Sequence, residues 1–172
     1  MKFSIAETIC RLCAPRHELS CSWWLWCRLL TGLRRRGRNA TRESGAFLLG
    51  RRTNGRARVI DFVLYDDLDP HSLDTGIVRF DGRHFGRLWD LCKRRSLTVV
   101  ADVHTHPGSS QQSESDRAHP MVTRAGHIAL IVPSFARQPV RRTEVGLFRY
   151  LGGKRWETIQ YECRRTFFHI GI

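Results

Sequence analysis

The feature that most constrains the fold of this chain is an apolar, β-branched run that ends in two histidines. Residues 97–103 read Leu-Thr-Val-Val-Ala-Asp-Val, and His104-Thr105-His106-Pro107 follows directly. β-Branched residues favour strands, and side chains two apart in a strand project from the same face. The run therefore predicts a buried strand that places two imidazoles together at its carboxyl end. In open α/β sheets, this end of a strand is a common place for ligands.

A carboxylate beyond the second histidine completes a candidate metal site. Asp116 follows the histidines across a loop of Gly, Ser and Gln that can fold back over the end of the strand. Two imidazoles and one carboxylate leave a tetrahedral zinc ion with one open position, which is typical of catalytic rather than structural sites. Hydrolysis by metal-activated water also needs a base. Glu43, an isolated acid just before a glycine-bracketed apolar run, is the candidate for that role.

Ser113 supplies a hydroxyl that can stabilise a tetrahedral oxyanion. The pattern Ser113-x-x-Asp116 is also typical of a capped helix start, so a purely structural role for Asp116 stands beside the metal role. The two roles are compatible, because a ligand in the first helical turn is well positioned. His119 and His127 are expected to be structural histidines, with support of the metal ligands as the alternative. Asp102 is interpreted as facing away from the histidine pair.

The remaining hydrophobic patterns predict a mixed α/β chain without internal repeats. Asn54-Gly55 predicts a tight turn between two strands, and therefore a hairpin. Helices are expected from Cys21 to about Arg36 and from Phe85 to Arg95, where apolar residues recur at helical spacing and basic residues suit the last turn. Strands are expected at 45–50, 57–65, 77–80, 97–103, 127–132, 143–150 and 156–161.

The length of 172 residues, 41% of them hydrophobic, suits one compact domain with its own core. Residues 1–20 show no clear period and are expected to form a loose or partly helical leader before a single domain at 21–172. Cys10 and Cys13 form one CxxC, but no second pair follows, so a redox or zinc-knuckle site is weakly indicated. We find no secretory signal and no apolar run of the roughly 20 residues that a membrane span needs. A reduced, cytoplasmic protein is therefore expected.

The charge of the chain is strongly positive, at +13, and only Lys2, Lys93 and Lys154 of its 29 basic residues are lysines. The arginines fall in short scattered groups without interleaved aromatic residues. This favours a compositional bias over the whole surface, while weak, salt-sensitive binding of polyanions stays open. Trp23, Trp24 and Trp26 are expected to pack in the core, with a dimer or partner contact as the alternative.

These motifs together resemble the JAMM, or MPN-type, metalloproteases, whose best known members are deubiquitinases. The resemblance rests on Glu43 before a Gly-hydrophobic-Gly strand, on His104-Thr105-His106-Pro107 and on Ser113-x-x-Asp116, and it spans residues 25–160. It implies an α/β, cytidine-deaminase-like fold, with a mixed β-sheet flanked by helices. It also implies one zinc per chain held by His104, His106 and Asp116, with Glu43 as general acid/base and Ser113 as oxyanion stabiliser. The loop before Ser113 is one residue shorter than the commonest family spacing, which we interpret as a feature of a bacterial-type branch.

The resemblance further implies a zinc-dependent isopeptidase or tail-processing peptidase that cleaves after the C-terminal tail of a ubiquitin-like protein. In such enzymes the tail lies extended along the sheet. The short segments 66–76 and 133–143 suit a minimal enzyme for a ubiquitin-like or sulfur-carrier-like protein, with activating and conjugating enzymes as further partners. An acidic partner would complement the basic surface. The alternatives are a zinc amidohydrolase or peptidase acting on a cell-wall, phage-related or small-molecule amide, and a non-catalytic MPN scaffold.

Overall fold

The structure, a computed structural model, describes residues 17–38, 40–137 and 139–171. Its main elements are β1 (Leu19–Ser22), α2 (Trp23–Arg36), β2 (Gly45–Thr53), β3 (Arg56–Leu64), α3 (Tyr65–Leu68), α4 (Phe85–Arg95), β4 (Thr98–Thr105), α5 (Glu114–Ala118), β5 (Ile128–Val132), β6 (Gly146–Gly152), β7 (Arg155–Thr158), α6 (Arg164–Phe167) and β8 (Phe168–Gly171). Short 3₁₀ turns lie at Gly82–His84, Ser134–Ala136, Arg142–Glu144 and Tyr161–Cys163.

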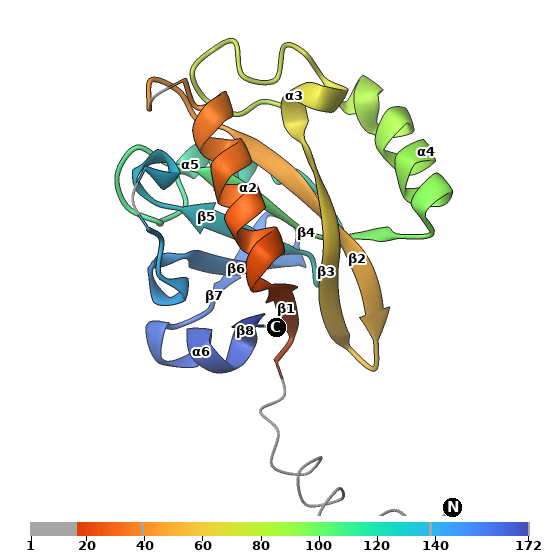
Figure 1. Cartoon of the computed structure of the whole chain (residues 1–172), viewed down its shortest axis with the longest axis vertical. Coiled ribbons are helices and arrows are strands. Elements are labelled where there is room, and N and C mark those ends of the chain that lie inside the picture. Colours follow the sequence, from red (N-terminus) through yellow and green to blue (C-terminus); the bar gives the residue numbers. More distant parts are fainter. Residues whose placement is uncertain (1–16, 39, 138, 172) are drawn as a thin grey trace, which may run out of the picture.

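The strands form one mixed, eight-stranded sheet in the order β7-β6-β5-β4-β2-β3-β1-β8. The inner strand β4 pairs antiparallel with β2 and parallel with β5. Figure 1 shows the sheet strongly twisted, with the long helix α2 crossing it and α4 standing on the other side of β2. The predicted α/β fold with a mixed sheet and flanking helices is confirmed.

Two apolar clusters hold the helices to the sheet. The larger one contains the buried face of α2, including Leu29 and Leu33, together with Leu48 of β2. The smaller one joins Leu88 of α4 to Phe47 of β2. Because both clusters include side chains of β2, that strand is covered on each side, which keeps its neighbour β4 inside the molecule.

Helix α2 begins later than its sequence pattern predicts. Ser22 is its N-cap, where the hydroxyl accepts a hydrogen bond from the amide of Leu25 at 3.3 Å, so Cys21 belongs to β1. Trp26 lies in the core, as expected, but Trp23 and Trp24 remain 53% and 72% exposed. Successive helical residues are about 100° apart, so neighbouring tryptophans cannot share one buried face. A dimer or partner contact through this helix stays a prediction.

The hairpin of β2 and β3 is confirmed, with the turn at Asn54 and Gly55, both of which have a positive φ. The strand expected at 77–80 is wrong. Its backbone groups bond outside any ladder: the amide of Val78 donates to the Glu43 carboxylate, and that of Arg79 donates to the Ser72 carbonyl. An extended, apolar segment can therefore lie beside the sheet without joining it.

The last two strands at one end of the sheet, β1 and the edge strand β8, pair in parallel and were not expected. Leu19 and Ser20, which fell within the predicted leader, form the start of β1, and Leu19 is fully buried. The rest of that leader up to residue 16, with Cys10 and Cys13, lies outside the described residues. The division into a leader and a single domain stays a prediction.

The described part of the chain contains neither a disulfide bond nor a helix that could span a membrane. Its cysteines Cys21, Cys27, Cys92 and Cys163 are all free thiols. Within that part, no helix combines the length and the apolar character needed to cross a membrane.

Candidate metal centre

Strand β4 positions the two histidines through a regular hydrogen-bonded register. His104 lies opposite Gly45 of β2 and Ile131 of β5. Just past the strand, the amide of His106 donates to the carbonyl of Val132 at 3.0 Å. The backbone around both histidines is thus tied to neighbours on two sides, and the two side chains project together, as the strand pattern predicts.

Asp116 comes from the first turn of the short helix α5, and Ser113 is the N-cap of that helix. The Asp116 Oδ2 accepts hydrogen bonds from the Ser113 amide at 2.7 Å and from the Ser113 hydroxyl at 2.8 Å. The capping arrangement considered from the sequence is therefore present. It directs the carboxylate toward the histidines, so capping and contact with the imidazoles coexist.

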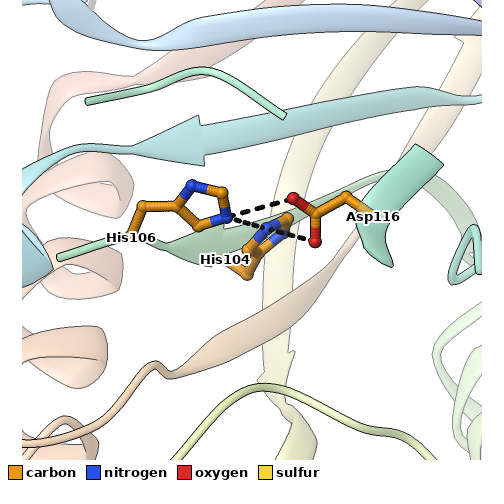
Figure 2. Close-up of side chains that lie close together, drawn as sticks. All are labelled: His104, His106 and Asp116. Atoms are coloured by element: carbon orange, nitrogen blue, oxygen red, sulfur yellow. Dashed lines mark hydrogen bonds and ion pairs between the residues drawn. The ribbon is translucent and has the colours of Figure 1, made fainter. Parts of the chain in front are cut away.

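Three ligand atoms converge at this point, as Figure 2 shows. The Nε2 atoms of His104 and His106 lie 3.0 Å apart, and they lie 3.4 and 3.1 Å from Asp116 Oδ1 and Oδ2, respectively. Zinc bonds of about 2.0–2.2 Å at a tetrahedral angle separate two ligand atoms by roughly 3.3 Å. The two distances to Asp116 are to different oxygens of one carboxylate, and one ligand atom from each of the three residues lies within 4.8 Å of the others. This arrangement fits ligands of a single metal ion.

Electrostatics couple these groups strongly. Burial lowers the pKa of His104, but the hydrogen bond and negative charge of Asp116 outweigh burial and raise that pKa above its ordinary value. Burial raises the pKa of Asp116, but hydrogen bonds from His104 and His106 outweigh it and hold that pKa well below the usual range. The buried histidines are thus paired with an ionised carboxylate, a site where a cation can replace the histidine proton.

Glu43 lies beside this cluster without bonding to the ligand atoms. Its Oε1 is 3.9 Å from His106 Nε2, and its Oε2 accepts from the Val78 amide at 3.1 Å. The next residue, Ser44, donates its amide to the Thr105 hydroxyl at 3.0 Å, and both residues are buried. This bond fastens the Glu43 segment to the histidine strand. All five residues singled out from the sequence therefore lie together at one end of β4.

The interpretation of Asp102 as facing away is wrong. Asp102 and His104 are two residues apart in β4, so they share a face. Asp102 is buried and contacts the His127 Nε2 at 2.5 Å and the Tyr65 hydroxyl at 3.1 Å. Burial, followed by the charge of Asp102, raises the pKa of Tyr65 well above its ordinary value. The equal spacing of 102, 104 and 106 was a signal available in the sequence.

Gly45 has a steric role next to this network. A Cβ atom added to it would lie 2.2 Å from Cε2 of Tyr65. Gly45 is the residue of β2 that lies directly across from His104. Because it has no side chain, the Tyr65 ring can lie against β2 at this position and its hydroxyl can reach Asp102.

A cavity of about 410 Å³ opens beside Asp116. Its lining includes Val78, Phe80, Phe85 and Met121, with His119 at the side of α5. His119 Nδ1 lies 3.2 Å from the carbonyl oxygen of Ser115 and makes no described contact with the ligand atoms. Arg79 and Ser115 also line the cavity. A ligand in this cavity would therefore lie next to the candidate metal centre.

The fold and this cluster define an α/β protein with a candidate metal centre at the end of its inner strand β4. The chain belongs to the prokaryotic homologs of the JAB domain, because the model of that family matches residues 29–144. The match includes Glu43, both histidines and Asp116, and it confirms the resemblance to JAMM, or MPN-type, proteins.

Two individual proteins show similarity at different levels. A probable metalloprotease of Sinorhizobium fredii is 35% identical over 66 residues, which cover 38% of this chain and 41% of that relative. The match thus spans about two fifths of that relative's length. A solution structure of a protein from Desulfitobacterium hafniense superposes with a TM-score of 0.61 at 15% identity, covering 81% of this chain and 88% of the other. At that identity, the likeness supports the fold alone.

Proposed function

We propose that this protein is a zinc metallopeptidase that hydrolyses the bond after the C-terminal tail of a ubiquitin-like protein, as an isopeptidase or a tail-processing peptidase. The observation that carries the proposal is the convergence of His104, His106 and Asp116, whose ligand atoms lie within 4.8 Å of one another. Zinc is the metal that favours two imidazoles and a carboxylate with one position left open.

In this proposal, bound zinc supplies Lewis acidity, which lowers the pKa of water and polarises a carbonyl group. Glu43 performs the proton transfers. The Val78 amide holds one oxygen of its carboxylate, and the other oxygen faces the cluster. That free oxygen takes a proton from the attacking water and returns it to the leaving amine.

Ser113 has two roles in the proposal. Its hydroxyl bonds to Asp116 and so orients a metal ligand, as outer groups commonly do. The same hydroxyl, 2.8 Å from Asp116 Oδ2, would also donate a hydrogen bond to an oxyanion that develops on the substrate. The bond to Asp116 would then be exchanged for a bond to the substrate.

Support for an extended peptide substrate comes from the cavity beside Asp116 and from the extended residues 78–80 that line it. A ubiquitin-like tail is extended and could lie along this segment. Family membership and the S. fredii relative support peptidase chemistry. The net charge of +13 favours an acidic partner protein, including a ubiquitin-like one.

The test is cleavage of a ubiquitin-like fusion by the full chain, together with metal analysis of the purified protein. We expect about one zinc per chain. The Glu43→Gln variant should keep zinc but lose cleavage by at least about a hundredfold, because it removes the proton-transfer group. Glu114→Gln, which removes an acid from the first turn of α5, should cleave normally.

Other outcomes separate the alternatives. Zinc-loaded protein that cleaves small amides or cell-wall peptides but no ubiquitin-like fusion would replace the proposed substrate. Zinc-loaded protein without activity toward any of these would indicate an MPN scaffold. Normal cleavage by Glu43→Gln would contradict only the assignment of the base.

A further inference from the structure

A second candidate site lies on the β2–β3 hairpin, far from the metal ligands. A hollow of about 750 Å³ there is lined by three arginines, by hydroxyl and amide side chains, and by a few apolar residues. We call it the arginine hollow and define it by Arg51, Arg56, Arg58, Ser20, Leu25 and Ile60.

The arrangement of these arginines is unfavourable for the isolated sheet. Arg51 and Arg58 are direct cross-strand partners, and Ser20 of β1 lies next to Arg58 on the other side. Like charges that face each other across antiparallel strands destabilise the pair. Arg56 adds a third positive charge two residues along β3. The fold therefore gathers positive charge here although the repulsion between facing arginines destabilises the hairpin.

Acidic residues balance other arginines but not these. Arg36 pairs with Asp66 and Asp67, and Arg149 pairs with Glu18 and Glu157. Among the described residues, no ion pair is formed by the three arginines of the hollow. Their guanidinium groups are exposed and have donors available for an anion from solution.

The chemistry of the lining indicates which anion fits. Guanidinium groups bind phosphate oxygens through paired hydrogen bonds, and the Ser20 hydroxyl adds another donor. Leu25 is buried and Ile60 is 44% exposed, so the hollow also offers an apolar surface. Its volume lies within the range of small-molecule sites. We propose that the arginine hollow binds a phosphate ester of about nucleotide size.

This site is separate from the metal centre. Gly45 of β2 lies opposite His104, and Arg51 lies six residues further along the same strand, which corresponds to roughly 20 Å. Figure 1 shows the tip of this hairpin at the opposite end of the molecule from α3. Loss of the metal ligands should therefore leave phosphate binding intact, so this proposal and the peptidase proposal can fail independently.

The experiment measures binding to the full chain by calorimetry at low salt. The probes are ADP, inorganic phosphate, a short thymidine oligonucleotide and a hexaglutamate peptide. We expect ADP or the oligonucleotide to bind, and Arg51→Gln and Arg58→Gln each to weaken that binding about tenfold. The tighter of the two ligands identifies the source of the phosphate. Arg94→Gln, which removes an exposed arginine from α4, is the charge-matched control and should change affinity less than twofold.

Two further measurements distinguish a lost phosphate contact from a variant that has not folded correctly. Arg58→Lys keeps the charge but removes the planar fork, so its affinity should lie between those of the wild type and Arg58→Gln. Thermal unfolding of Arg58→Gln at low salt should occur at the same or a higher temperature, because a repulsive pair is removed. Equal weakening by Arg94→Gln, hexaglutamate binding as tight as that of the phosphate compounds, or no binding of any phosphate probe would each overturn the proposal.

Discussion

The metal centre and the arginine hollow use charge in opposite ways. At the metal centre, His104 and His106 are buried and paired with Asp116, so opposite charges meet where water is excluded. In the hollow, Arg51 and Arg58 face each other at the surface without a described acidic partner. Buried charge survives only when it is paired, whereas hydrated charge can remain unpaired at small cost. The charges of the metal centre are thus neutralised within the folded protein itself. The charges of the arginine hollow would be neutralised only by a bound anion.

The largest effect should come from removing a metal ligand. His104→Ala deletes one of three converging atoms, so zinc affinity should fall by at least about a hundredfold, and cleavage should be lost with it. His119→Ala is the matched control, because His119 lies nearby without contacting the ligand atoms. Competition with a chelating dye measures both affinities. Near-normal zinc binding by His104→Ala would refute the assigned ligand set.

The next effect concerns the buried pair behind the ligands. Asp102→Ala leaves His127 and the Tyr65 hydroxyl without their shared partner, and breaking such a buried pair costs about 3–5 kcal/mol of unfolding free energy. Asp90→Ala on the exposed side of α4 should cost little. Urea unfolding of both variants provides the measurement. A loss below about 1 kcal/mol for Asp102→Ala would show that the pair is replaceable.

A third effect is the pH dependence of metal binding. The pKa of His104 in the metal-free protein lies above 6.5, and its imidazole must lose a proton to bind zinc. As the pH is lowered, zinc affinity should therefore begin to decrease before the pH reaches 6.5. It should then decrease about tenfold for each further unit of acidification. Asp116 stays ionised in this range because its pKa is low. Zinc titrations from pH 8 to pH 5.5 check this, and a flat profile would contradict it.

Stability of the metal-free protein should change in the opposite direction. A histidine whose pKa is raised by folding stabilises the folded state fully below its unfolded pKa of about 6.5. That contribution is lost as the pH rises through the raised pKa of His104. Metal-free protein should thus lose stability over the pH window in which zinc binding strengthens. Thermal unfolding with and without zinc measures both trends.

The smallest effect belongs to the hollow. Arg51→Thr removes the cross-strand repulsion and should raise the unfolding free energy by about 0.2–1 kcal/mol at low salt. At high salt the gain should shrink, because exposed charges are screened. A destabilised Arg51→Thr variant at low salt would mean that the arginine stem contributes packing that outweighs the repulsion.

The candidate site could be predicted from the sequence because its residues are close together in two short stretches. The spacing of His104 and His106 defines a shared face once the strand is recognised. Glu43 is the exception, since its distance from the histidines depends on the pairing of β2 with β4. Its place next to a glycine-bracketed strand, and the family resemblance, made that long-range contact predictable.

Other features depended on contacts that a local pattern does not contain. Strands β1 and β8 have four residues each and are defined only by pairing with each other and with β3. The segment 77–80 has the composition of a strand, but side-chain and loop partners satisfy its backbone. The Arg51–Arg58 pair was not predicted either, although the two-residue turn at Asn54-Gly55, which was predicted, sets the register of the hairpin next to it.

The contact between Gly45 and Tyr65 has an evolutionary consequence. Any mutation that adds a side chain at position 45 meets the Tyr65 ring and also the Val103 carbonyl oxygen, which would lie 2.9 Å from the new Cβ atom. A smaller residue at 65 would relieve only the first of these two contacts. That second change also removes the hydroxyl that bonds to Asp102. The effects of mutations at positions 45 and 65 are therefore expected to depend on each other. A double variant with a side chain at 45 and a smaller residue at 65 would still lack the hydrogen bond to Asp102, next to the histidines of β4.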